Sequence, residues 1–270
     1  MTSARKSNSR FVQCYRWTRT CVHALEGVST TMLIFPLVSA TTRRALIKRW
    51  SARLLRILAV EARFDGEMAT QGGNVLVVAN HISWLDIFVL NAVHPVRFVA
   101  KSELTQWPVI SQMIRGAGTV FIERERRRDT HRVNEQMARV LAGGDVVAIF
   151  PEGTTTDGSD MLPFKSSLLQ PIVEARGHVQ PVAIRYCSHD GALSLAPAYV
   201  GDTSFASSFW SMCGARMTVV TLSARPPLAA HASHRRELAR AAEISIRMVL
   251  ASPANATAPE THDDPTSATQ

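Results

Sequence analysis

The stretch from Asn74 to Asp86, NVLVVANHISWLD, constrains the fold of this chain more than any other. Its first half is an apolar run rich in β-branched valine, which is typical of a buried strand. Polar residues follow at once, and Ser83 and Asp86 have the spacing of a helix-capping box. The stretch therefore predicts a strand, a turn and a helix that begins at Ser83 and runs through Leu90. His81 falls in the turn, and open α/β sheets bind ligands at such carboxyl ends of strands.

His81 and Asp86 are five residues apart in the sequence. On one straight helix these two side chains would point about 140° apart, so a contact requires His81 to lie before the helix. From the turn, the imidazole can fold back over the first helical turn. Asp86 then accepts a hydrogen bond from one ring nitrogen and leaves the other free as a base. The alternative is that Asp86 only caps the helix and His81 is a turn residue, although a carboxylate has lone pairs for both tasks.

Strands and helices alternate along the rest of the chain. The pattern predicts strands at 96–100, 119–122, 146–150, 180–185 and 216–223, and helices at 107–114, 129–141 and 235–250. This alternation predicts an α/β fold with a mixed, largely parallel sheet flanked by helices. A length of 270 residues suits one principal domain with an appendage. We expect a basic, membrane-associating helical segment at 1–59, the main domain at 60–250 and a disordered tail at 251–270.

Positive charge is concentrated in the amino-terminal segment. Residues 1–57 hold eleven of the 30 lysines and arginines but only one of the 22 acidic residues, so they carry +10 while the whole chain carries +8. A basic arm on a nearly neutral body favours an anionic surface as partner, either a membrane or a nucleic acid. No nucleic-acid-binding motif accompanies the charge, so we expect a membrane surface and no nucleic acid.

The same segment contains two stretches that suit a membrane surface. The apolar run 27–40, interrupted by Pro36, is short for a membrane-spanning helix, and we expect it to insert at the interface or re-enter. A cleaved signal peptide is the alternative, because basic residues precede the run and small residues end it. Residues 42–59 predict a basic amphipathic helix that lies on anionic lipid, the alternative being a helix packed on its own domain.

Three predicted strand ends carry polar residues: 80–86, Glu123-Arg124 and 151–154. If these strands are parallel, the three ends meet at one edge of the sheet. A histidine base, an arginine and a glycine-bearing turn suit an anionic substrate with a hydroxyl to deprotonate. Arg124 would bind a phosphate by charge-assisted hydrogen bonds, Gly153 would let the backbone approach, and Thr154 or its neighbour would donate. The alternative for the 151–156 turn is an ordinary surface connection.

Several other kinds of site are disfavoured. The chain has no nucleophile elbow, Walker loop or dinucleotide-binding glycine motif. Its four cysteines show no close pairing, which argues against a metal or disulfide framework and favours reduced thiols in a cytosolic setting. His231 and His234 have helical spacing but no acidic or cysteine ligand nearby, so we expect no metal site.

The motifs assembled above occur in the order of the four sequence blocks of glycerolipid acyltransferases, and over about residues 70–225 the chain resembles that family. The blocks are Asn80-His81-x-Ser83-x-x-Asp86, Gly118-Thr119-Val120-Phe121-Ile122-Glu123-Arg124, Phe150-Pro151-Glu152-Gly153-Thr154 and Val179-Gln180-Pro181-Val182-Ala183. The chain looks most like bacterial 1-acylglycerol-3-phosphate acyltransferases. The continuation Tyr199-Val200-Gly201-Asp202-Thr203-Ser204-Phe205 resembles the branch that includes lyso-ornithine-lipid O-acyltransferases.

The resemblance implies roles for individual residues. His81 would be the general base on the acceptor hydroxyl, and Asp86 would orient it. Arg124, Glu152 and Gly153 would bind the acceptor head group, with Thr154 beside them. The fourth block, which contains Pro181, would help to shape the site.

The resemblance also implies the reaction. A fatty acyl group passes from acyl-CoA or acyl carrier protein, a co-substrate and not a cofactor, to a lysophospholipid hydroxyl. Transfer to 1-acylglycerol-3-phosphate would give phosphatidic acid in phospholipid biosynthesis, at the cytoplasmic face of the inner cell membrane. A lyso-ornithine lipid is the alternative acceptor. Two alternatives to acyl transfer are a catalytically idle membrane-binding module and phospholipid hydrolysis by activated water.

Overall fold

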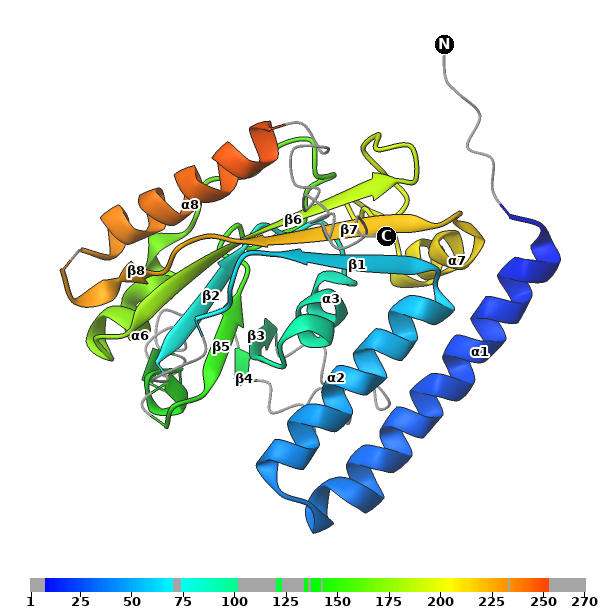
Figure 1. Cartoon of the computed structure of the whole chain (residues 1–270), viewed down its shortest axis with the longest axis horizontal. Coiled ribbons are helices and arrows are strands. Elements are labelled where there is room, and N and C mark those ends of the chain that lie inside the picture. Colours follow the sequence, from blue (N-terminus) through cyan, green and yellow to red (C-terminus); the bar gives the residue numbers. More distant parts are fainter. Residues whose placement is uncertain are drawn as a thin grey trace, which may run out of the picture.

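The computed structural model describes residues 8–69, 74–101, 120–122, 134–135, 137–141, 143–232 and 234–252, and its centre is a mixed β-sheet (Figure 1). Across these residues the strand order is β1-β7-β6-β2-β5-β3-β4, with β8 also paired to β6. The strands are β1 (Val60–Asp65), β2 (Val75–Ala79), β3 (Arg97–Lys101), β4 (Val120–Ile122), β5 (Val146–Ile149), β6 (His178–Ser188), β7 (Thr218–Ala224) and β8 (Leu228–Ala229).

The pairing of these strands confirms the predicted fold class. β2 runs parallel to both of its neighbours, β5 and β6, and β3 runs parallel to β5 and β4. Antiparallel pairing joins β6 to β7 and β8, and β1 is parallel to β7. The carboxyl ends of β2, β5, β3 and β4 therefore meet at one edge of the sheet, as the sequence predicted.

Helices cover both faces of the sheet, and β2 contributes to both layers. Val75, Val77 and Ala79 face a core shared with α2 (Ala40–Ile57), α3 (Asp86–Val93) and α7 (Phe205–Gly214). Leu76 and Val78 face a second core, shared with α6 (Gln170–Glu174) and α8 (Arg235–Ala251). This explains why the β2 sequence is continuously apolar: every one of its side chains is buried.

The strand and helix positions largely agree with those predicted. The segments predicted as strands at 96–100, 119–122, 146–150, 180–185 and 216–223 correspond to β3, β4, β5, β6 and β7, and the helix at 235–250 is α8. The helix after β2 begins at Asp86 and not at Ser83, because the capping turn itself occupies residues 83–85. The predicted helix at 107–114 and the tail after Ser252 lie outside the described residues.

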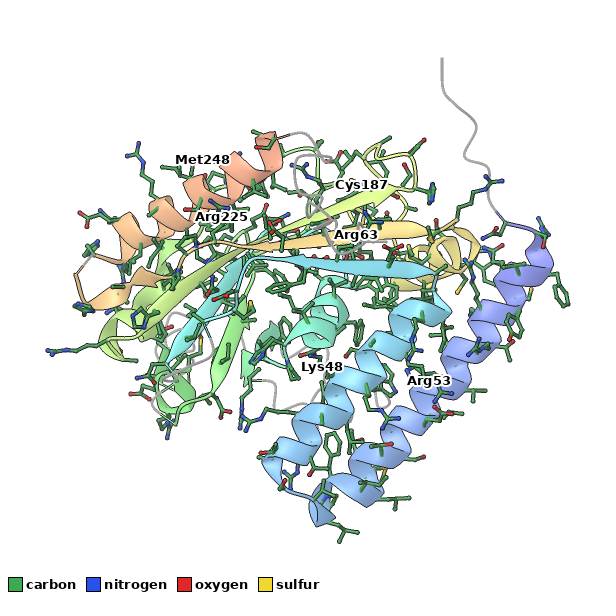
Figure 2. All side chains as sticks on the ribbon, in the orientation of Figure 1. Lys48, Arg53, Arg63, Cys187, Arg225 and Met248 are labelled. Atoms are coloured by element: carbon green, nitrogen blue, oxygen red, sulfur yellow. The ribbon has the colours of Figure 1, made fainter. Side chains whose placement is uncertain are left out.

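An amino-terminal helical hairpin extends from the sheet (Figure 1). It consists of α1 (Arg10–Ser29), one π-helical turn (η1, Thr30–Ile34), one 3₁₀ turn (η2, Phe35–Leu37) and α2. The two helices are joined by polar contacts: Arg53 donates to Glu26 at 2.8 Å, and the Trp50 indole donates to the His23 carbonyl at 3.0 Å. Figure 2 shows Lys48 and Arg53 along α2. Residues 10–29 lie in the segment 1–59 that the sequence predicted to be helical, although no separate helix was assigned to them there.

The apolar face of α2 is largely used within the protein. Leu54, Leu55 and Ile57 are buried, and Leu54 and Leu55 join the core that contains α3. The carboxyl-terminal half of α2 is thus packed on its own domain, which was the alternative to lying on lipid. Exposed apolar side chains gather instead on α1 and at the tip of the hairpin, where Leu37 is 84% exposed.

One helical segment meets the length and composition of a membrane span. It comprises Arg10–Leu37, 28 residues, and 22% of its most apolar window is buried inside the protein. The turns η1 and η2 continue α1 without a break, so the apolar run that was short in the sequence becomes the end of a longer helical segment.

Candidate active site

The site begins where β2 ends, and Asn80 fixes this point. Its side chain is buried between β2 and β6, where Nδ2 donates to the Ile184 carbonyl at 2.9 Å and Oδ1 accepts from the Ile184 N–H at 2.7 Å. The amide thus replaces the next backbone rung of the β2–β6 ladder. The chain leaves the sheet at a defined place, and His81 is the next residue.

His81 and Asp86 are in direct contact. Nδ1 of His81 lies 2.8 Å from Oδ2 of Asp86, and the imidazole is 20% exposed while the carboxylate is fully buried. Because a carboxylate only accepts, Nδ1 carries the proton in this bond and Nε2 has a free lone pair. The contact expected from the turn-then-helix geometry is therefore present, and the catalytic role of the two residues remains a prediction.

Asp86 has three further donors. Its Oδ2 also accepts the backbone N–H groups of Ile82 at 2.8 Å and Ser83 at 3.0 Å, and its Oδ1 accepts the Tyr186 hydroxyl at 2.8 Å. The bond from Ser83 is one half of the predicted capping box. Asp86 thus caps the turn and orients His81 at the same time, which the sequence had left open.

The turn after β5 holds His81 from the other side. Glu152 accepts the His81 backbone N–H at 2.7 Å, and the Thr156 N–H donates to the His81 carbonyl at 2.8 Å. The imidazole also stacks on the Phe150 ring, with 4.0 Å between centroids and 7° between planes. Both the backbone and the ring of His81 are therefore fixed, and only the Nε2 side of the imidazole remains for a substrate.

Glu152 is used by the protein backbone. It is buried, and its second oxygen accepts the Leu162 N–H at 2.7 Å, so each carboxyl oxygen has a backbone partner. Burial raises the pKa of Glu152 above the usual 4.5, although the two backbone N–H donors oppose the shift. Its expected role in binding the acceptor head group remains a prediction, since the structure shows it organising the turn.

Gly153 lies beside a lysine. Its backbone has a φ of +77°, which L-amino acids with a side chain rarely adopt, and a Cβ at this position would collide with Nζ of Lys165. The backbone N–H of Lys165 donates to the Pro151 carbonyl at 2.9 Å, and this bond anchors the segment from which the Lys165 ammonium extends. A positive charge therefore lies next to the glycine turn at the carboxyl end of β5.

The remaining predicted residues differ in their placement. Thr154 is exposed on the same turn, whereas the neighbouring Thr155 donates its hydroxyl to the Tyr199 carbonyl. Pro181 is buried in β6 opposite Val78, behind the strand end and not at it. Arg124 lies outside the described residues, and the strand before it, β4, ends at Ile122 on the same sheet edge.

Three residues that contact the site were not predicted from the sequence to be part of it. Tyr186 donates to Asp86, Phe150 stacks on His81, and Lys165 lies against Gly153. Tyr186 comes directly after the strand predicted at 180–185, and β6 extends past it to Ser188, where the buried phenol needs a hydrogen-bond partner. Within the described residues, no cluster of three or more histidine, cysteine or acidic side chains is arranged to hold a metal.

Comparison with known proteins agrees with this geometry. Residues 61–185 match the family model described as Acyltransferase. The chain is 39% identical over 182 residues to the 1-acyl-sn-glycerol-3-phosphate acyltransferase of Neisseria gonorrhoeae, covering 67% of this chain and 71% of that one. The chain belongs to the acyltransferase family.

Two further comparisons extend the assignment. The acyltransferase is 36% identical over 208 residues to the lyso-ornithine lipid O-acyltransferase of Pseudomonas aeruginosa, covering 77% of this chain and 79% of that one. It also shares its fold with the crystal structure of the 1-acyl-sn-glycerophosphate (LPA) acyltransferase PlsC from Thermotoga maritima. That likeness has a TM-score of 0.67 at 22% identity, over 89% of this chain and 93% of that one.

The raised pKa of Glu152 makes the stability of this acyltransferase depend on pH. The folded state disfavours the ionised carboxyl of Glu152. The contribution of Glu152 to the free energy of unfolding is therefore greatest below pH 4.5, and it is lost as the pH rises through the raised pKa of the folded state. The Tm of the wild type, measured relative to that of Glu152→Gln at the same pH, should therefore fall as the pH rises from below 4.5 towards neutral. Glu174→Gln, on an exposed helix end, is the control. A pH-independent difference for Glu152→Gln would contradict the interpretation.

Proposed function

We propose that this acyltransferase moves a fatty acyl group from an acyl thioester to the free hydroxyl of 1-acylglycerol-3-phosphate, giving phosphatidic acid. The observation that carries the proposal is the bond of 2.8 Å between Nδ1 of His81 and Oδ2 of Asp86. It leaves Nε2 as a base at the carboxyl end of β2, beside the turn that carries Gly153, against which the Lys165 ammonium lies. The name of the relative from Neisseria gonorrhoeae supports the choice of acceptor.

The reaction proceeds by direct transfer. Nε2 of His81 removes the proton of the acceptor hydroxyl while the hydroxyl oxygen attacks the thioester carbonyl carbon. The tetrahedral intermediate then expels the thiolate, and the imidazolium gives its proton to this leaving group. The products are an ester and a free thiol, and His81 is neutral again. Asp86 holds the imidazole in one tautomer and stabilises its positive charge during the step. The thioester is already activated, so no acyl-enzyme is required.

The acceptor head group is held at the same edge of the sheet. We assign its phosphate to Arg124, with the backbone at Gly153 and the hydroxyl of Thr154 beside it, and Pro181 shapes the strand behind them. The exposed Lys165 supports this assignment, because its ammonium lies against Gly153 and forms no ion pair within the described residues. Acyl-CoA or acyl carrier protein is the donor, and the reaction uses neither a cofactor nor a metal.

His81→Ala should remove the base and little else, because the His81 backbone is held by Glu152 and Thr156. We expect thiol release from acyl-CoA with lysophosphatidate present to fall about 100- to 10,000-fold, the contribution of a general base. Circular dichroism and the melting temperature should stay close to those of the wild type. Wild-type turnover by this variant would exclude His81 as the base, and no thiol release by the wild type would favour an idle binding module.

The acceptor is tested separately. Purified enzyme supplied with one acyl-CoA and one acyl-carrier-protein donor should convert lysophosphatidate to phosphatidic acid with a larger kcat/KM than lyso-ornithine lipid, measured by mass spectrometry. The relative from Pseudomonas aeruginosa makes lyso-ornithine lipid the second candidate. A larger kcat/KM for lyso-ornithine lipid would reassign the acceptor, and free fatty acid in place of diacyl product would indicate hydrolysis.

We further propose that the helical hairpin places the enzyme on a membrane surface. Large apolar side chains are exposed at its tip, with Met32, Leu33 and Leu37 all more than half exposed. The exposed basic residues Arg43 and Arg49 lie on the next helix and suit anionic lipid. We assign the enzyme to the cytoplasmic face of the inner membrane, and the four unpaired cysteines support a reducing compartment.

The hairpin tip can be tested with the variant Leu33→Glu/Leu37→Glu. It should bind vesicles containing phosphatidylglycerol roughly 100-fold more weakly in a flotation assay, since two leucines no longer enter the apolar layer. Met248→Glu is the matched control, because Met248 is 58% exposed on α8, far from the hairpin (Figure 2). Equal binding by the tip variant and the control would contradict the proposal.

A further inference from the structure

Asp86 has a second carboxyl oxygen that His81 does not use. Three donors, from His81, Ile82 and Ser83, converge on Oδ2, whereas the Tyr186 hydroxyl donates to Oδ1 at 2.8 Å. Among the described residues Tyr186 is the only side chain or backbone group bonded to Oδ1. Together with the two backbone donors on Oδ2, the phenol therefore fixes how the carboxylate is turned about its Cβ–Cγ bond, and with it the direction from which Oδ2 meets the imidazole.

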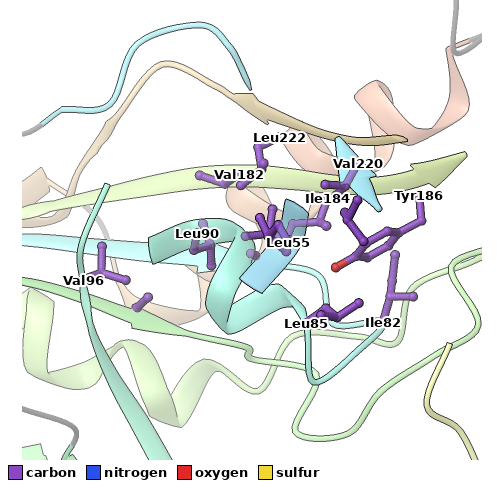
Figure 3. Close-up of a cluster of buried hydrophobic side chains, with 14 of the residues drawn as sticks. Leu55, Ile82, Leu85, Leu90, Val96, Val182, Ile184, Tyr186, Val220 and Leu222 are labelled. Carbon is purple, nitrogen blue, oxygen red and sulfur yellow. The ribbon is translucent and has the colours of Figure 1, made fainter. Parts of the chain in front are cut away.

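Tyr186 reaches Asp86 from a different part of the chain. It lies on β6, 100 residues after Asp86, and its side chain is fully buried. Figure 3 shows its ring beside Ile82 and Leu85, with the hydroxyl oxygen turned into the cluster. The Tyr186 hydroxyl and Oδ1 of Asp86 satisfy each other, and both side chains are buried. The hydrogen bond therefore lies in an apolar environment, where it is stronger than it would be in water.

The register of β6 depends on the start of the catalytic turn. The Asn80 amide binds both backbone groups of Ile184, and Tyr186 is two residues further along, on the same face of the strand. A residue next to His81 thus sets the strand position from which Tyr186 reaches back to Asp86. The Asn80–Ile184 contact and the Tyr186–Asp86 contact therefore both connect β6 to the segment that contains His81.

We propose that Tyr186 is a positioning residue of the acyl-transfer reaction, which acts through Asp86 to hold His81 in the orientation that removes the acceptor proton. The inference rests on the proposed role of His81 as the base. It assigns to Tyr186 a function beyond packing, because the phenol also balances part of the carboxylate charge that faces the imidazole.

The phenol acts as a donor throughout the working pH range. Burial and the Asp86 charge raise the pKa of Tyr186 well above its usual value, so it stays protonated. The other titratable groups near this network are Glu152, which accepts from the His81 backbone, and Lys165 at the adjacent turn. Neither donates to Asp86, so neither replaces the lost bond when the hydroxyl is removed.

Tyr186→Phe keeps the ring and removes only the hydroxyl. We expect kcat to fall about 10-fold with the KM for lysophosphatidate unchanged, since a hydrogen bond to a charged group is lost away from the substrate. The acid limb of the pH–kcat profile should move to higher pH, because the less compensated carboxylate holds the imidazole proton more strongly. Thr218→Val, which removes a buried hydroxyl on β7 that is bonded only locally, is the control and should leave kcat and the limb unchanged.

The double variant His81→Ala/Tyr186→Phe separates this inference from the proposed function. If Tyr186 acts through His81, its loss should cost nothing further once His81 is absent. Full activity of His81→Ala alone would overturn the base itself. If His81→Ala loses activity as expected, any one of three results would show that the inference about Tyr186 is wrong. Tyr186→Phe could keep the wild-type kcat, or the acid limb of its pH–kcat profile could stay in place or move to lower pH. In the third case, Tyr186→Phe would lower kcat further in the His81→Ala background.

Discussion

A carboxylate without access to solvent is stable in a folded protein only where donors surround it, and Asp86 is in this position. Its four donors come from His81, from the turn that begins α3 and from the distant strand β6. The carboxylate therefore joins the end of β2 to its neighbouring strand and to the helix that follows. The buried carboxylate that orients the His81 imidazole also holds the turn in which His81 lies.

The glycine turn after β5 completes the site by a different means. Glu152 also turns its carboxylate inward, but both of its oxygens accept from the backbone. The two acidic residues of the site thus have different structural roles. Asp86 orients the side chain of His81, and Glu152 orients the main chain around it. The ammonium of Lys165 lies beside this turn, against Gly153.

The sequence predicted those parts of the molecule that depend on local order. The apolar run of β2 and the spacing of His81 and Asp86 specify a strand, a turn and a contact within six residues. Tyr186 and Lys165 were missed because they reach the site through strand register and loop packing, which local patterns do not encode. The hairpin shows the same limit: α2 was predicted as a helix, but its packing against α3 depends on tertiary contacts.

The long separations within the network around His81 affect how the enzyme acquires activity. Glu152 is bonded to a residue 71 positions earlier in the chain, and Asn80 to one 104 positions later. Such pairings close large loops, and the chain entropy lost in closing them must be offset by the contacts that they bring together. His81 and Asp86 are only five residues apart in the sequence, but the contacts that Glu152 and Asn80 add around them require strands far along the chain. The geometry of the site is therefore complete only when the central sheet has formed.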